Sequence, residues 1–186
     1  MTSIKTKELI LCGMCAAITC ILAPISVPIG PVPISLCTFA VMLAGVLLGG
    51  KFGFISQLVY VLLGAVGVPV FAGYSAGVSC IAGMTGGYIV AYPVLALLTG
   101  LIYWKFGRNR SGKRRILWMF LGMVIGTAVL YAFGTAWFCA VSGTGVAAAM
   151  GMCVIPFLPG DLLKMVVVIL ISLPMEKALA RTGSAQ

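Results

Sequence analysis

Two charged side chains, Asp161 and Lys164, lie within an apolar segment near the end of this chain. Asp161 is the only acidic residue inside the hydrophobic segments, because Glu8 and Glu176 lie near the two chain ends among lysines. A charge buried in hydrocarbon costs roughly 2.5–3.5 kcal/mol. The i, i+3 spacing places both side chains on one face of a helix. The pair therefore predicts a site for a neutral, strongly hydrogen-bonding ligand: the carboxylate accepts from N–H groups and the ammonium donates to an oxygen.

A simpler interpretation of the same pair needs no ligand. Asp161 follows Pro159-Gly160 and could cap the start of a helix, where the helix dipole favours a negative charge. Lys164 would then extend outward to lipid headgroups. Capping explains the acid but leaves the lysine a full turn inside the helix, so we favour the binding site.

The composition predicts an integral membrane protein. Hydrophobic residues make up 62% of the 186 residues and charged residues only 8%, a balance that no soluble core of this size needs. A spanning helix takes about 20 apolar residues, so the length admits at most six or seven spans in one compact domain, residues 1–186. The net charge of +9 does not indicate nucleic acid, because the basic residues border the apolar segments instead of following a groove or one helix face.

Six membrane spans account for the apolar segments. They are Glu8–Ala23, Ser35–Gly49, Phe52–Val66, Thr85–Trp104, Ile116–Val141 and Gly160–Met175. The lysine-led N-terminal segment resembles a signal peptide, but it has no convincing cleavage site and is interpreted as the first span. With six spans, every lysine and arginine except Lys164 falls on the side of the two termini, which the positive-inside rule identifies as the cytoplasm. The expected fold is an all-α bundle of six transmembrane helices with both termini cytoplasmic.

The three outer connections differ in character from ordinary loops. They are uncharged and apolar, and seven of the nine prolines lie in or beside them, at positions 24, 28, 31, 33, 69, 156 and 159. Such segments could fold onto the helix ends as a lid over a pocket, or they could simply rest in the membrane interface.

The middle outer connection and the start of the fourth span carry glycines and aromatic residues. Phe71, Tyr74 and Tyr88 could wall an apolar ligand. Gly86 and Gly87 could let backbone amides at the helix N-terminus bind a carboxylate. The same two glycines could instead allow close packing between helices.

Small residues form a stripe along the first span. Gly13, Ala16, Ala17 and Cys20 recur at intervals of three and four residues, a surface on which another helix could dock closely. Packing within this chain explains the stripe equally well.

The sequence does not indicate an enzyme. It has no GxxxxGK[ST] nucleotide loop, no histidine, no second membrane acid and no recognisable nucleophile. The seven cysteines are spread singly through apolar segments and are interpreted as small apolar side chains, so neither a metal nor a cofactor is expected. An intramembrane enzyme and a purely structural membrane subunit remain as alternatives from other classes.

Four segments together resemble the BioY family, the biotin-binding S components of energy-coupling factor (ECF) vitamin transporters. They are Pro33-Ile34-Ser35-Leu36, Gly67-Val68-Pro69-Val70-Phe71-Ala72-Gly73, Thr85-Gly86-Gly87-Tyr88 and Pro156-Phe157-Leu158-Pro159-Gly160-Asp161-Leu162-Leu163-Lys164. The resemblance covers nearly the whole chain in the same order and spacing. The sequence departs from the family pattern at Cys37, where a glutamine is usual, and at Met84, where a proline is usual.

The resemblance implies a high-affinity biotin-binding subunit in the plasma membrane of a prokaryote. Its partners would be a membrane T component, docked on the small-residue stripe, and two ATPases that hydrolyse ATP. The matching motifs add Ser35, Gly73 and Thr85 to the candidate ligand-binding residues. Asp161 and Lys164 could satisfy the ureido ring of biotin, with its carboxylate at backbone amides near Thr85 or at Lys164, so the orientation stays open. An S component for another vitamin and a stand-alone facilitator are the alternatives within transport.

Overall fold

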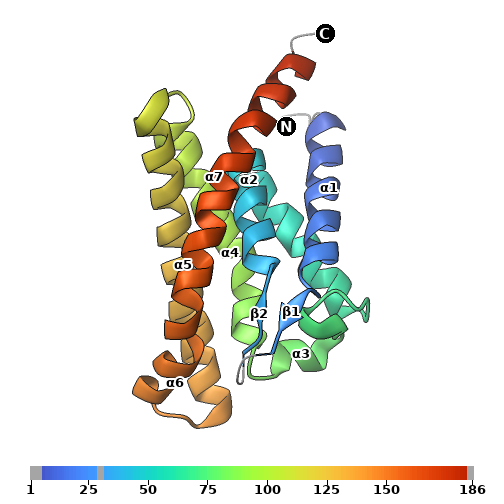
Figure 1. Ribbon diagram of the computed structural model, residues 1–186. Helices are drawn as coiled ribbons and strands as arrows, with labels where there is room; N and C mark the ends of the chain where they lie inside the picture. Colours follow the sequence, from blue (N-terminus) through green and yellow to red (C-terminus); the bar gives the residue numbers. More distant parts are fainter. Residues whose placement is uncertain (1–5, 29–31, 184–186) are drawn as a thin grey trace.

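The computed structural model describes residues 6–28 and 32–183 as a helical bundle (Figure 1). The helices are α1 (Thr6–Leu22), α2 (Cys37–Ala65), α3 (Val78–Ala82), α4 (Gly86–Ile102), α5 (Gly112–Ser142), α6 (Val146–Cys153) and α7 (Leu158–Gly183). Shorter helical turns are η1 (Ala72–Tyr74), η2 (Tyr103–Gly107) and η3 (Ile155–Phe157). Lys5 and Pro31, which enter the predicted topology, lie outside the described residues, as do the side chains of Lys7 and Arg181.

Four helical segments of the described chain are long and apolar enough to cross a membrane. They are Cys37–Ala65, Gly86–Gly107, Gly112–Ser142 and Val146–Leu179, and a shorter apolar helix covers Glu8–Leu22. The chain is therefore an integral membrane protein.

Helix α2 reverses direction at Gly49. This glycine has φ 78° and ψ 176°, which a side chain would disfavour and which interrupts the helix. Cys37 Sγ lies 3.7 Å from the hydroxyl of Tyr60, whereas a straight helix would separate the two residues by about 35 Å at 1.5 Å per residue. Residues 37–48 and 50–65 therefore form an antiparallel helical hairpin, and these halves match the predicted second and third spans.

The other predicted spans correspond to α1, α4, α5 and α7. The connections expected as loops contain short elements, of which the first is a departure from the all-α prediction. Residues Ser26–Val27 (β1) pair antiparallel with Ile34–Ser35 (β2), with Ser26 opposite Ser35. The last connection, expected as a loop, contains α6 and η3. In Figure 1 the strands, α3 and α6 lie at one end of the bundle, while α1 begins and α7 ends at the other.

Glycines allow the central helices α2 and α4 to approach closely. A Cβ atom at Gly100 would lie 2.3 Å from the backbone nitrogen of Gly50, and one at Gly45 would lie 2.6 Å from the carbonyl oxygen of Ala96. Small residues are the usual means of bringing membrane helices together, because lipid supplies no hydrophobic drive for their association.

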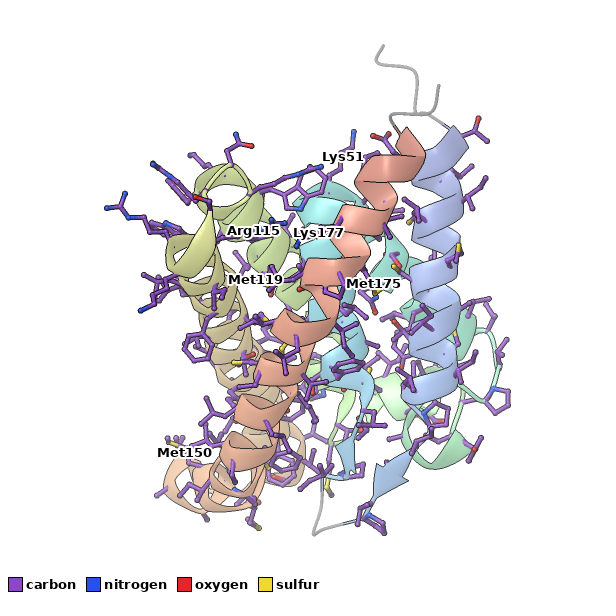
Figure 2. All side chains as sticks on the ribbon, turned by 45° about the horizontal axis from the view of Figure 1, so that its top comes forward. Lys51, Arg115, Met119, Met150, Met175 and Lys177 are labelled. Carbon is purple, nitrogen blue, oxygen red and sulfur yellow. The ribbon has the colours of Figure 1, made fainter. Side chains whose placement is uncertain are left out.

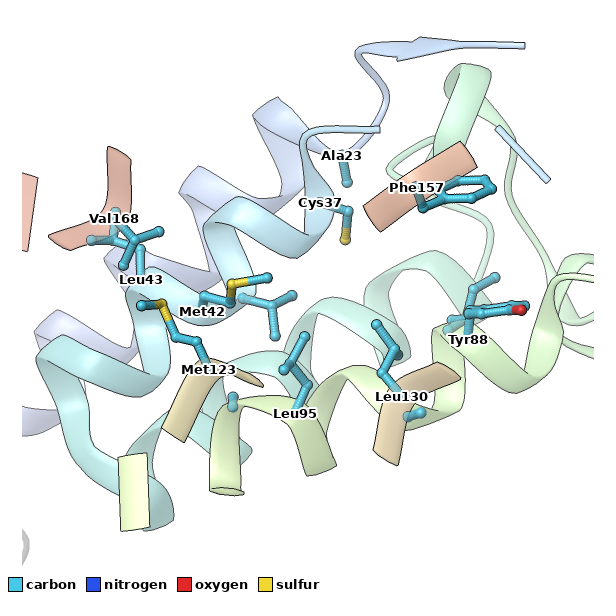
Figure 3. Close-up of a cluster of buried hydrophobic side chains, with 14 of the residues drawn as sticks. Ala23, Cys37, Met42, Leu43, Tyr88, Leu95, Met123, Leu130, Phe157 and Val168 are labelled. Atoms are coloured by element: carbon cyan, nitrogen blue, oxygen red, sulfur yellow. The ribbon is translucent and has the colours of Figure 1, made fainter. Parts of the chain in front are cut away.

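The centre of the bundle is filled by apolar side chains (Figure 3). Met42 of α2, Leu95 of α4 and Met123 of α5 are fully buried there. Figure 3 also shows Tyr88 and Phe157 together toward one side of this cluster, with Val168 of α7 toward the other. The apolar core therefore lies between the end that carries α3 and α6 and the end where α1 begins and α7 ends.

The close approach at Gly100 predicts a position-specific loss of stability. Gly100→Ala should lower the free energy of unfolding by about 1–3 kcal/mol, because the added methyl group meets backbone atoms of the α2 hinge. Thermal unfolding of the purified protein in detergent measures the effect. Gly13→Ala is the matched control, since this helical glycine has no neighbour within 4 Å of an added Cβ and gains the same helix propensity. Equal melting midpoints for the two variants would contradict the prediction.

Candidate ligand-binding site

Asp161 and Lys164 form an ion pair at the start of α7. Lys164 Nζ lies 2.8 Å from Asp161 Oδ1, and the lysine and aspartate side chains are 12% and 4% exposed. Lys164 also donates to the carbonyl oxygen of Ser35 at 2.8 Å and to Thr38 Oγ1 at 3.0 Å. All three ammonium N–H groups therefore point into the protein, which excludes the interpretation that Lys164 extends outward to lipid headgroups.

The carboxylate of Asp161 has two further donors that the sequence analysis did not anticipate. Thr38 Oγ1 donates to Oδ1 at 3.0 Å, and the hydroxyl of Tyr131 donates to Oδ2 at 2.5 Å. A buried charge is tolerated only when it is paired and its lone pairs are satisfied. The cluster of Asp161, Lys164, Thr38 and Tyr131, called the polar cluster below, meets this requirement with side chains from α2, α5 and α7.

The polar cluster lines a cavity of about 190 Å³, compared with the roughly 10–15 Å³ that one water molecule requires. Most of the remaining wall is apolar, aromatic or weakly polar. The lining residues are Val32, Pro33, Ser35, Cys37, Thr38, Tyr60, Phe71, Ala72, Ser75, Cys80, Gly83, Thr85, Tyr88, Ile89, Tyr92, Leu130, Tyr131, Cys153, Phe157, Asp161 and Lys164. A cavity with one charged cluster and an aromatic wall suits a small molecule that is apolar over most of its surface.

Six of the ten predicted ligand-binding residues line this cavity. Asp161 and Lys164 do so together with Ser35, Phe71, Thr85 and Tyr88. The hydroxyl of Tyr88 lies 3.0 Å from Thr135 Oγ1, which fixes the ring.

The other four predicted residues lie outside the lining. Tyr74 is 69% exposed, and the amide of Gly73 donates to the carbonyl of Pro24 at 3.1 Å. Gly86 and Gly87 serve close packing instead, since a Cβ at Gly87 would lie 2.3 Å from the Cβ of Trp137. For these two glycines the structure therefore shows close packing within the chain, the second of the two roles considered from the sequence.

Backbone amides at the start of α4, considered as donors to a ligand carboxylate, are already used in part. The amide of Gly86 donates to the carbonyl of Gly83 at 3.0 Å, and the amide of Tyr88 donates to that of Thr85 at 3.1 Å. A ligand carboxylate at this helix end would compete with these bonds.

Tyr60 holds the aromatic wall in place from the second half of α2. Its hydroxyl donates to the carbonyl of Val70 at 3.2 Å and accepts from Cys37 Sγ. Its ring meets that of Phe71 edge to face, with centroids 5.8 Å apart. Phe71 lies directly on Gly64, where an added Cβ would come within 2.1 Å of the ring. The position of Phe71 at the cavity therefore depends on a buried tyrosine and on a glycine.

The small-residue stripe of α1 is divided between two faces. Ala16 is buried, and Cys20 packs partly against the core. Gly13 and Ala17 are exposed, and Gly13 has open space around it. Only the second pair, which we call the Gly13–Ala17 face, is available to another protein.

The comparisons with known proteins agree with this architecture. The BioY family model matches residues 1–181, so the chain belongs to the BioY family. It is 42% identical over 168 residues to a protein of Pyrococcus horikoshii named probable biotin transporter BioY, covering 90% of this chain and 95% of the relative. It is 35% identical over 171 residues to the biotin transporter BioY of Thermotoga maritima, covering 92% and 96%.

Solved structures give the same result for the fold. The crystal structure of the S component for biotin from an ECF-type ABC transporter superposes with a TM-score of 0.81 at 29% identity, over 93% of this chain and 92% of that one. A second S component of a bacterial ECF transporter, at 21% identity and a TM-score of 0.63, shares the fold.

The buried ion pair predicts an asymmetry between single and double substitutions. Lys164→Met should destabilise the protein by up to about 3 kcal/mol, because it leaves the Asp161 carboxylate buried without a cation. The double variant Asp161→Leu/Lys164→Met should recover most of this loss, since neither charge then remains. Thermal unfolding of the two variants beside the unmodified protein tests the prediction, and a double variant less stable than Lys164→Met would refute it.

Proposed function

We propose that this protein is the biotin-binding S component of an ATP-driven ECF importer. It is a single domain that captures biotin at the outer face of a prokaryotic plasma membrane and has no resident cofactor. The observation that carries the proposal is the cavity in which Asp161 and Lys164 face the wall of Phe71 and Tyr88, in a chain of the BioY family. Relatives named as biotin transporters and an S component solved as specific for biotin support biotin as the ligand.

The proposed topology has six crossings with both termini in the cytoplasm. The crossings are α1, the two halves of α2, α4, α5 and α7, supported by the reversal at Gly49. Figure 2 labels Lys51, Arg115 and Lys177 at one end of the bundle, with Met150 of α6 at the other. Basic residues gathered at the end where α1 begins and α7 ends support the assignment of that end to the cytoplasm. The cavity then opens toward the outer side.

The polar cluster suggests which ligand group meets which side chain. Lys164 already donates three hydrogen bonds, so it has no N–H left for a ligand unless one bond is exchanged. Among the described residues, the Tyr131 hydroxyl is the one donor to Asp161 Oδ2, which leaves this oxygen acceptor capacity. We therefore assign a ureido N–H of biotin to Asp161 Oδ2, with the apolar ring system and valerate chain along the aromatic wall.

Energy for transport would come from separate subunits. The chain has no nucleotide-binding loop of its own, and S components belong to ABC-type assemblies. We propose that a membrane T component docks on the Gly13–Ala17 face and that two ATPases complete the transporter.

Calorimetric titration of biotin into purified protein, freed of co-purified ligand, tests the function directly. Binding of one biotin per chain at nanomolar affinity, without heat from riboflavin or thiamine, is the expected result. Heat from one of these controls and not from biotin would assign the protein to another vitamin. No heat from any of the three would refute a vitamin-binding function.

Asp161→Asn should weaken biotin binding at least tenfold, about 1.4 kcal/mol or more, because an amide replaces the charged acceptor of the ureido N–H. Calorimetry on the folded variant measures the loss. Glu176→Gln is the matched control, an isosteric change on the same helix that lies far from the cavity lining, and its affinity should stay within about twofold of the unmodified protein. Unchanged affinity in Asp161→Asn would remove this residue from the site.

Gly13→Leu should abolish assembly with the T component while leaving biotin affinity unchanged, because a bulky side chain on the Gly13–Ala17 face prevents close helix approach. Co-purification of the partner subunits and calorimetry provide the two readouts. Gly151→Leu is the control, since Gly151 of α6 is another exposed helical glycine with open space. Equal assembly by the two variants would show that the partner docks elsewhere.

A further inference from the structure

Five exposed cations lie in and beside the connection between α4 and α5. They are Lys105, Arg108, Arg110, Lys113 and Arg114. Within the described part of the chain none of them forms an ion pair, whereas Arg115, the next basic residue, is paired with Glu176. Five uncompensated cations within ten residues make this segment the densest run of positive charge in the sequence.

An aromatic platform orders this basic segment. Trp104 is fixed by its indole N–H, which donates to the carbonyl of Val46 at 2.9 Å, and by its ring, which lies against Gly49. The guanidinium of Arg108 stacks on Trp104, 3.6 Å from the ring centroid. Stacking holds the planar guanidinium ready for a bidentate anion at little further loss of side-chain entropy.

Apolar side chains beside the cations place the segment at the membrane surface. Phe106 and Trp118 stack with centroids 4.9 Å apart, and Phe106 is 44% exposed. Ile116 and Leu117 are exposed on the next turn. Aromatic and basic side chains side by side at the end of a spanning helix are typical of headgroup depth, with rings in the interface and cations among the phosphates.

We propose that this segment, residues 104–118, binds the phosphate headgroups of anionic phospholipids. Arg108, stacked on Trp104, is its main phosphate-binding residue. Two N–H groups of the guanidinium match two oxygens of one phosphodiester. The neighbouring cations add electrostatic attraction to an anionic surface. The proposal rests on the cytoplasmic assignment of this end, because anionic lipid of the inner leaflet is the ligand.

The test is native mass spectrometry of the purified full chain titrated with phosphatidylglycerol and with phosphatidylcholine of the same acyl chains. We expect at least a fivefold preference for the anionic lipid. Arg108→Gln/Arg110→Gln should remove most of this preference. Lys51→Gln/Lys177→Gln removes the same charge at the same end of the bundle and should reduce it less than twofold (Figure 2). Arg108→Lys, which keeps the charge without the planar fork, should give an intermediate loss.

Equal losses of lipid preference in the two double variants would overturn the proposal, since general attraction between net charges would then explain the binding of anionic lipid. Equal binding of the two lipids by the unmodified chain would also overturn it. Loss of the ATPase subunits from the complex in Arg108→Gln/Arg110→Gln, with lipid preference unchanged, would assign the segment to a protein partner instead. Biotin affinity should be unchanged in every variant, so failure of biotin binding and failure of lipid binding are separate results.

Discussion

The carboxylate of Asp161 is the constraint on which the cavity end of this protein depends. Its side chain is 4% exposed among apolar helices, where an unpaired charge would cost several kcal/mol. The groups that satisfy it come from three separate helices: Thr38 from α2, Tyr131 from α5 and Lys164 from α7 itself. Lipid alone does not drive these helices together. Their hydrogen bonds to the Asp161 carboxylate join them at this point.

The same requirement shapes how a ligand can bind. The three N–H groups of Lys164 are already used, so an acceptor group of a ligand reaches this ammonium only by exchanging one of its bonds. Oδ2 of Asp161 is the position with spare acceptor capacity, and an N–H donor can be added there without breaking an existing bond. The aromatic wall, fixed by Tyr60 behind Phe71, is already in place to cover the apolar part of the ligand.

The sequence predicted the membrane class, the positions of the long apolar helices and the charged pair, because hydropathy and charge are local signals. Asp161 was detectable since an acid is rare in an apolar segment. Thr38 and Tyr131 were not, because hydroxyl side chains are common in membrane helices and only the fold shows which ones face the carboxylate. Gly86 and Gly87 left two interpretations open for a related reason: a glycine permits close approach of either a ligand or another part of the chain. In the structure an added Cβ at Gly86 would meet Ile81 and one at Gly87 would meet Trp137.

Helices α5 and α7 are joined at both ends by polar pairs. Tyr131 meets Asp161 near the end that carries α6, and Arg115 meets Glu176 near the opposite end, where both also bond the hydroxyl of Tyr103. The pairs are separated by 16 residues on α5 and 15 on α7, about 22–24 Å in each helix. Matching separations fix the register of two antiparallel helices. A ligand N–H that bonds Asp161 Oδ2 beside the Tyr131 hydroxyl leaves both pairs intact, so its binding does not require α7 to change register.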